Sequence, residues 1–299
     1  MTVSDSALPE WLIIVAWISL ALGILCSLLI AADIARRPQP MKVMNVVWPI
    51  CALFGSLLWL AGYLWWGRAD LPDKHAGTSA VDRTHAGAEA VPATTSKPMD
   101  RMTSMDGTKT MPGMDMKDMP GMGKPALGLS GKPHSMPVSV FCGTSHCGAG
   151  CSLADLIVEW TLFALPSFAV VGGLHWLFPD SISHGALYAG WVIAYFVALA
   201  TGITFQYFAI APMNPQRSRP GNIGAAAKAD VLSLSAWQIG MYGVMAIAQL
   251  VVFPAWFGGQ VSVGTPVFWL TMQLAMLAGF CTAYPVNWWL ISSGVKERM

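Results

Sequence analysis

Six stretches of this chain are apolar and long enough to form helices that cross a membrane. A helix of about 20 apolar residues spans the roughly 30 Å hydrocarbon layer of a bilayer. The stretches cover approximately residues 11–33, 45–66, 153–178, 187–211, 231–256 and 267–292. Trp and Tyr gather near their ends, as is typical of the interface between lipid and water. The pattern therefore predicts an all-α, polytopic membrane helix bundle with six transmembrane helices.

The composition indicates the same class of protein. Of the 299 residues, 55% are hydrophobic and 11% are charged, whereas soluble domains carry about 25% charged residues. The net charge of +1 gives no indication of an acidic partner. We expect the lipid bilayer to be the main partner, and we expect no nucleic acid to bind.

A long segment without apolar periodicity separates the second stretch from the third. It divides the chain into a two-helix N-terminal membrane block (residues 1–67), a Met- and His-rich flexible loop (68–141) and a four-helix membrane core (142–299). The loop contains too few large apolar side chains to fold on its own.

Eight methionines concentrate in this loop, among Pro, Gly, Asp and Lys. They are Met99, Met102, Met105, Met111, Met114, Met116, Met119 and Met122. Thioether sulfur is a soft ligand that favours Cu(I) among the biological metals. We therefore expect residues 99–122, the Met-rich segment, to capture Cu(I). The alternative is a low-complexity linker without a ligand.

A second group of soft ligands opens the membrane core. His146, Cys147 and Cys151 lie close together in the sequence, with Cys142 just before them. Thiolate and imidazole also suit Cu(I), so these residues are candidate metal ligands. Their spacing matches no defined zinc pattern. A disulfide, a redox pair or two packed thiols are therefore alternatives.

Carboxylates follow these cysteines at helical spacing. If the helix reaches back to Cys147, then Cys147, Cys151, Asp155 and Glu159 follow one another at i, i+4 and share a face. A carboxylate inside a membrane is costly and normally faces the bundle interior. We expect Asp155 and Glu159 to line an ion pathway. Asp230, at the start of the fifth helix, is a further pathway candidate, although its charge also suits a helix N-terminus.

Other polar residues of the membrane core have simpler explanations. Gln206 and Asn287 are expected to form hydrogen bonds between helices. A methionine stripe at helical spacing on the fifth helix, including Met241 and Met245, is expected to be core packing.

Several stretches of the sequence carry a family resemblance. They are Pro40-Met-Lys-Val-Met44-Asn45-Val-Val-Trp48-Pro49, His146-Cys-Gly-Ala-Gly-Cys151 with Asp155 and Glu159-Trp160, Phe205-Gln206-Tyr207-Phe208-Ala-Ile-Ala-Pro212-Met213, Lys228-Ala-Asp230 with Leu232-Ser233-Leu234, and Tyr284-Pro285-Val-Asn287-Trp288-Trp289-Leu290-Ile291. Together they resemble an uncharacterised bacterial membrane family, domain of unknown function 4396. The resemblance implies a multi-helix membrane protein with the His-Cys…Cys element and supplies no activity. Residues 76–133 do not resemble the family and are interpreted as an insertion.

The sequence gives conflicting signals on orientation in the membrane. Six crossings would place the N-terminus, the Met-rich segment and the C-terminus on one side. Lys and Arg near the helix ends favour the cytoplasm for that side. Methionine-rich copper segments make most sense in an oxidising compartment, and Glu10 before the first helix with Arg36 and Arg37 after it favours an outside N-terminus. We expect a multi-pass protein of the bacterial inner membrane with the Met-rich loop in the periplasm.

These observations lead to one main functional hypothesis and two alternatives. The main hypothesis is a Cu(I)-binding integral membrane protein for copper transport or delivery, with a copper chaperone or cuproenzyme as a further partner. The first alternative is a membrane thiol-disulfide/quinone oxidoreductase that uses Cys147 and Cys151. The second is a non-catalytic subunit or assembly factor of a membrane complex. The sequence contains no nucleotide-binding motif, and we expect a transporter or metal-binding protein rather than an enzyme.

Overall fold

A computed structural model describes residues 2–3, 8–69, 135–165, 185–213, 215–296 and 298. The eight methionines of the Met-rich segment lie outside these residues. So do residues 166–184, which include the expected end of the third helix.

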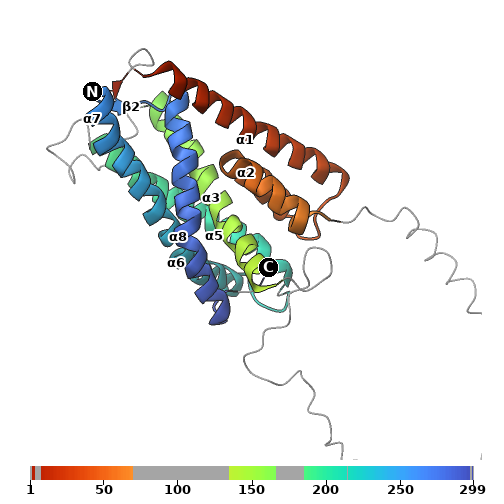
Figure 1. The fold of residues 1–299 in the computed structure, drawn as a ribbon. Helices are drawn as coiled ribbons and strands as arrows, with labels where there is room; N and C mark the ends of the chain where they lie inside the picture. The colour runs from red at the N-terminus through yellow and green to blue at the C-terminus, as the bar shows by residue number, and fades with distance from the viewer. Residues whose placement is uncertain are drawn as a thin grey trace, which may run out of the picture. The chain divides into compact units, whose positions relative to one another are not determined.

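The described chain is a bundle of helices (Figure 1). Its long elements are α1 (Glu10–Arg36), α2 (Met44–Gly62) with a π-helical turn η2 (Tyr63–Gly67), α3 (Met136–Ala164), α5 (Gly185–Met213), α6 (Arg219–Ala246) and α8 (Pro266–Ser292). A π-helical turn η4 (Ile247–Val252) and α7 (Phe253–Phe257) continue α6. Six helices are long and apolar enough to cross a membrane, which confirms the predicted fold class.

Helix α3 begins at Met136, well before the start near residue 153 that hydropathy predicted. Its first turns are rich in Gly, Ser and Thr, which lower the hydropathy and, for glycine, the helix propensity. Tertiary packing stabilises helices more than propensity does, and nearly all side chains from Val138 to Cys151 are buried. The loop was predicted to cover residues 68–141, and its last residues, from Met136 onward, are instead part of α3.

Helix α2 is a hairpin rather than one straight rod. Ser56 has φ 43° and ψ −118°, which breaks the helix in its middle. The rings of Trp48 and Tyr63 lie 5.6 Å apart, although 15 residues of continuous helix would separate them by about 22 Å. A Cβ added at Gly67 would collide with the Trp48 ring. Two arms, residues 44–55 of α2 and residues 57–67 of α2 and η2, therefore lie side by side, and we call them the re-entrant hairpin.

The tip of the re-entrant hairpin is held by side chains from two other helices. The Leu53 carbonyl accepts a 2.6 Å hydrogen bond from Gln273 of α8, and Ser19 of α1 donates to the other amide atom of Gln273. The Leu53 carbonyl also packs against Gly23, near the middle of α1. Irregular backbone at membrane depth needs such protein partners, and Gln273 supplies one.

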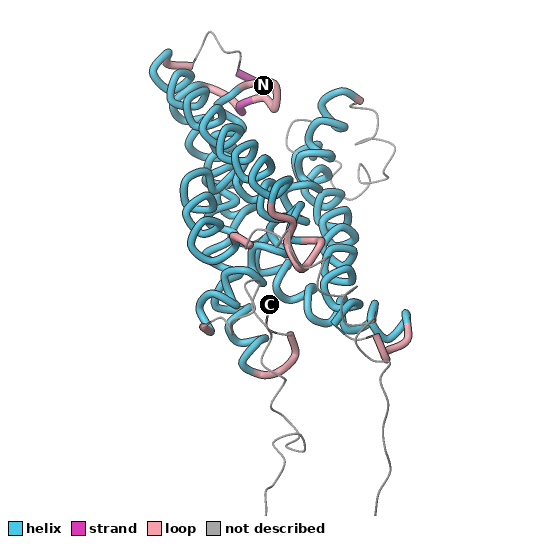
Figure 2. The backbone as a smooth tube through the Cα atoms, turned by 90° about the vertical axis from the view of Figure 1, so that its right-hand side faces the viewer, coloured by secondary structure: helices cyan, strands magenta, loops and turns pink. Residues whose placement is uncertain are grey.

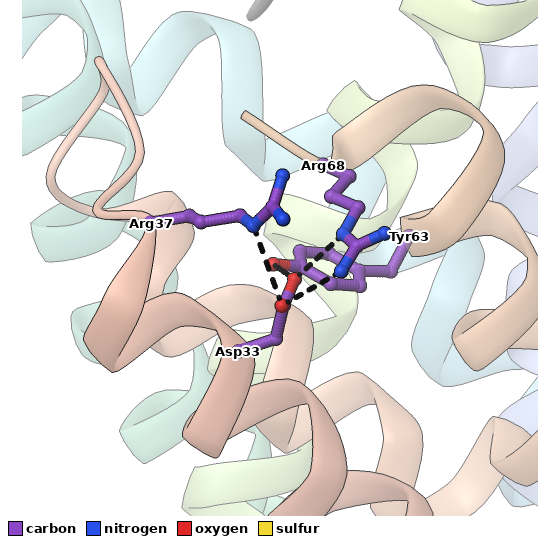
Figure 3. Close-up of polar contacts among 4 residues, drawn as sticks. All are labelled: Asp33, Arg37, Tyr63 and Arg68. Atoms are coloured by element: carbon purple, nitrogen blue, oxygen red, sulfur yellow. Dashed lines mark hydrogen bonds and ion pairs between the residues drawn. The ribbon is translucent and has the colours of Figure 1, made fainter. Parts of the chain in front are cut away.

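The base of the re-entrant hairpin is fixed to the end of α1 (Figure 3). Asp33 accepts two 3.0 Å hydrogen bonds from the Arg68 guanidinium and one of 2.9 Å from the Tyr63 hydroxyl. Arg37 adds a longer ion pair. The bonded carboxylate raises the pKa of Arg68. The chain thus leaves the re-entrant hairpin at the same end of the bundle at which α1 ends.

The N-terminus lies at the opposite end. Strand β1 (Thr2–Val3) pairs in parallel with β2 (Gln260–Val261), which lies in the connection between α7 and α8. At the other end, Tyr284 near the end of α8 donates to the Pro137 carbonyl at the start of α3. The N-terminus and the C-terminus lie toward opposite ends of the helices (Figure 2). We call the end with Arg68, Met136 and the C-terminus the C-terminal side. This arrangement differs from the expected one, in which both termini share a side, because α2 turns back.

Helices α3, α5 and α6 approach one another closely through glycines. A Cβ at Gly150 of α3 would lie 2.9 Å from the Cα of Gly202 on α5, so the two backbones are in contact. The Trp237 ring of α6 fills the space left at Gly148. Small residues at such contacts allow membrane helices to pack tightly. They bring the polar residues of α3 close to those of α6.

Candidate functional site

A line of polar side chains runs along the inner face of α3. Cys147, Cys151 and Asp155 are buried on successive turns, and Glu159 is half-buried one turn further. Helix α3 begins at Met136 and therefore includes Cys147, so these four residues share one face of the helix, as predicted. We call these four residues the α3 polar line.

The start of the α3 polar line meets a carboxylate from α6. Cys147 lies beside both Cys151 and the carboxyl group of Asp230. Asp230 is fully buried, and neither of its oxygens accepts a well-directed hydrogen bond from a described residue. Its carboxylate packs against Gly202, where a Cβ would overlap it. A buried polar group without a partner is costly and marks a candidate functional position.

The far part of the α3 polar line faces aromatic residues. Tyr242 of α6 lies within electrostatic range of Cys151, Asp155 and Glu159. Its ring stacks on Trp191 of α5 at 5.2 Å, and its hydroxyl donates to the Trp191 carbonyl. One oxygen of Asp155 has no hydrogen-bond partner in the described part of the chain. At this end of the α3 polar line, the carboxyl groups of Asp155 and Glu159 therefore lie near aromatic side chains of α5 and α6.

The structure separates His146 from the two cysteines that follow it. Neighbouring residues on a helix point about 100° apart, and the His146 ring lies against Phe205 of α5 at 6.3 Å. Both ring nitrogens are buried without a partner among the described residues. No group of three His, Cys, Asp or Glu side chains in the described chain is arranged to hold a metal ion. The Cys147–Cys151 pair is the part of the expected ligand set that lies together.

Cys142 lies near a third buried thiol, Cys51 of the re-entrant hairpin. Cys51 is within electrostatic range of both Cys147 and Cys142, and its thiol donates to the Ser145 carbonyl of α3. Trp59, on the other arm, donates to the Ser145 hydroxyl. Both arms of the re-entrant hairpin thus contact α3 just before His146. Sequence reasoning treated Cys51 only as a packed apolar residue.

Sequence reasoning also missed Lys296, which it counted only as a basic residue near a helix end. Its side chain is buried, and its ammonium group donates to the Gly143 carbonyl at 3.2 Å and to the Asn287 amide oxygen at 2.7 Å. Asn287 in turn donates to Ser233 of α6, as expected for a bond between helices. Gln206 differs from its expectation, since both of its amide atoms are buried without a partner in the described chain.

The comparisons with known proteins place this site within a family domain. The family model described as "Domain of unknown function (DUF4396)" matches residues 138–296. The chain belongs to the DUF4396 family. The match includes the α3 polar line, Asp230 and Lys296 of this DUF4396 protein, and it excludes the re-entrant hairpin. The stretch 40–49, which we expected to share the family pattern, lies outside it, as does the segment 76–133. The searches of curated proteins and of solved structures found no match.

Proposed function

We propose that this DUF4396 protein binds Cu(I) and transports or delivers it, with Cys147 and Cys151 as the receiving pair. One observation carries the proposal: two buried free thiols lie together at the head of a line of carboxylates inside a membrane bundle. Thiolates select soft ions such as Cu(I). Asp230 beside Cys147 supplies negative charge that attracts a cation.

The Met-rich segment supports the same metal from the sequence. Its eight methionines supply thioether ligands only, and soft thioethers also favour Cu(I). In the proposed sequence of events, the Met-rich segment captures the ion, the Cys147–Cys151 pair receives it, and Asp155 and Glu159 lie further along the path. A copper chaperone or cuproenzyme is the proposed partner.

The distribution of basic residues supports an orientation in the bacterial inner membrane. All 17 Lys and Arg residues fall in segments 36–42, 68–132, 217–228 and 296–298. Each of these segments begins or ends at the C-terminal side of the bundle, because α2 turns back. Cytoplasmic segments carry the excess of Lys and Arg. We therefore propose that the N-terminus is periplasmic and that the Met-rich segment is cytoplasmic. The sequence alone had led us to expect the Met-rich segment in the periplasm.

Metal titration of the purified full-length protein tests the proposal. Cu(I) would be titrated against a chromogenic chelator for the natural protein and for the double variant Cys147→Ser/Cys151→Ser. The double variant should lose its tightest Cu(I) site, and Cys26→Ser, which changes a buried cysteine of α1, should keep it. Replacement of the eight methionines by Leu should remove weaker sites only. Unchanged tight binding in the double variant contradicts the proposal.

The contact between the two thiols also favours a second function, thiol oxidation by a quinone. Cys147 and Cys151 would form a disulfide, and their two electrons and two protons would convert the quinone to a quinol. Incubation with a short-chain quinone, followed by mass spectrometry, tests this function. Rapid disulfide formation without tight Cu(I) binding supports this second function. If the protein shows neither disulfide formation nor tight Cu(I) binding, the result supports a non-catalytic subunit of a membrane complex.

A further inference from the structure

The C-terminus of this protein is folded back into the bundle by a defined turn. Gly294 follows α8 with φ +72°, the left-handed conformation that glycine adopts freely. The Gly294 amide donates to the Ile291 carbonyl, and the Val295 amide donates to the Leu290 carbonyl. This is the Schellman pattern that ends a helix. The turn directs Lys296 back toward α8 instead of letting it extend into solvent.

The bundle provides a place for the Lys296 side chain. A Cβ added at Gly143 would lie 3.7 Å from the Lys296 Cε, so the lysine stem packs over this glycine. The ammonium group is bound by two neutral oxygens, the Gly143 carbonyl and the Asn287 amide oxygen. In the described chain the ion pairs all involve Asp33, and none involves Lys296. A buried ammonium group without a paired carboxylate is unusual, since the penalty for burying a lone charge is large.

Two titratable groups of the candidate site interact electrostatically with this ammonium group without a direct ion pair. Asp230 and His146 lie within electrostatic range of Lys296. The hydrogen bonds from Lys296 to Asn287 and from Asn287 to Ser233 end one helical turn from Asp230. Asp230 is buried, accepts no well-directed hydrogen bond from a described residue, and lies beside Cys147 and within electrostatic range of Lys296.

We propose that Lys296 is a tethered cation that closes the approach from the C-terminal side to Asp230 and the Cys147–Cys151 pair. Its ammonium group occupies a cation-binding position made by the oxygens of Gly143 and Asn287. A soluble cation that enters by this route must displace Lys296 first, because two like charges repel strongly in a medium of low dielectric constant. The identity of that cation as Cu(I) rests on the proposed function, whereas the closure itself does not.

Thiol labelling in membrane vesicles measures the closure without any metal. A water-soluble maleimide would be added to vesicles with the C-terminal side outward, and modification of each cysteine would be followed by mass spectrometry. Lys296→Met keeps the length of the side chain and removes the charge. Its Cys147 should react about tenfold faster than in the natural protein, because a hydrogen bond to a charged group is worth roughly one factor of ten or more.

Three further variants make the result specific. Lys296→Arg keeps a cation and should remain slow. Lys228→Met removes an exposed basic residue of α6 on the same side and should also remain slow. Gly294→Ala strains the turn, with no atom within 4 Å of the new Cβ, and should increase the rate while Lys296 itself is intact. Unfolding would expose Cys26 as well, so labelling of Cys26 shows whether a variant is folded.

The outcomes separate this inference from the proposed function. Equal Cys147 rates in the natural protein, folded Lys296→Met and Gly294→Ala overturn the closure, even if Cu(I) binds tightly. Faster labelling in these two variants alone supports it, even if Cu(I) does not bind, and then the soluble cation is a different one. If Lys296→Met does not fold, Gly294→Ala decides the question.

Discussion

Asp33 and Asp230 are both carboxylates of the bundle, yet their surroundings are opposite. Asp33 lies at a helix end and accepts hydrogen bonds from Arg68 and Tyr63. Asp230 is fully buried, and no described residue donates a well-directed hydrogen bond to it. The first arrangement stabilises the fold, whereas the second costs stability. A residue that costs stability is expected to be retained for function.

The same substitution at the two positions should therefore have opposite effects on stability. Asp230→Asn keeps the shape and removes the charge, and it should raise the free energy of unfolding by on the order of 1 kcal/mol while Cu(I) affinity falls. Asp33→Asn should lower thermal stability in detergent and leave Cu(I) affinity unchanged. Thermal unfolding and chelator competition measure both quantities. A loss of stability in Asp230→Asn with unchanged Cu(I) affinity would show that the carboxylate has only a structural role.

Glu159 should matter for movement of the ion and not for its capture. It lies three helical turns from Cys147, about 18 Å along α3, and is too far to share a ligand set. Glu159→Gln should leave Cu(I) stoichiometry unchanged and reduce Cu(I) uptake into proteoliposomes about tenfold or more, the effect expected when a charge that stabilises a passing cation is lost. Equal uptake by Glu159→Gln and the natural protein argues against a pathway along α3.

At the level of the elements, the re-entrant hairpin depends on one amide side chain. Gln273 joins the Leu53 carbonyl at the tip to Ser19 of α1. Gln273→Leu leaves that carbonyl without a partner, which should cost about 1–3 kcal/mol of stability. Thr204→Val is a suitable control, because the Thr204 hydroxyl binds only a carbonyl of its own helix. Thermal unfolding in detergent compares the two, and equal stability would mean that the tip does not depend on Gln273.

The sequence predicts the helices better than it predicts their ends and turns. Apolar length marks all six helices, because burial in lipid requires it. The same measure cannot distinguish a crossing helix from a hairpin, since residues 44–67 are apolar on both sides of Ser56. It also places the start of α3 too late, because the turns that carry Cys142, His146 and Cys147 are rich in small and polar residues.

The candidate site was predictable only where one helix carries it. The spacing of Cys147, Cys151, Asp155 and Glu159 is fixed by helical geometry once α3 reaches Met136. The neighbours of the line come from other elements, and no local pattern predicts that Asp230 meets Cys147. Lys296 is similar: a lysine near a helix end normally extends to the interface. Gly294 in the turn after α8 is the local signal that could have indicated its return.

At the scale of the whole molecule, the re-entrant hairpin decides on which side each connection lies. A straight α2 would give six crossings, with both termini and the Met-rich segment on one side. With α2 folded back, we expect α1, α3, α5, α6 and α8 to cross the membrane, in agreement with the placement of the N-terminus and the C-terminus toward opposite ends of the bundle. The charges agree with this arrangement, because every segment that contains Lys or Arg then joins the described helices at the C-terminal side. With six crossings, the N-terminus and the Met-rich segment would have to lie on the same side of the membrane. With five crossings, a periplasmic N-terminus and a cytoplasmic Met-rich segment are compatible with each other.

Epitope tags test this topology in spheroplasts, where antibody reaches only the periplasmic face. Tags would be placed at the N-terminus, at residue 100, after Gly258 and at the C-terminus. Gly258 is a suitable insertion site, since its turn has open space around it. The N-terminal and Gly258 tags should bind antibody in intact spheroplasts, and the other two only after lysis. With six crossings, the N-terminal tag would instead behave like the tag at residue 100. That outcome would show that α2 crosses the membrane, and it would separate the basic segments onto two sides, so the cytoplasmic placement of the Met-rich segment would lose its support.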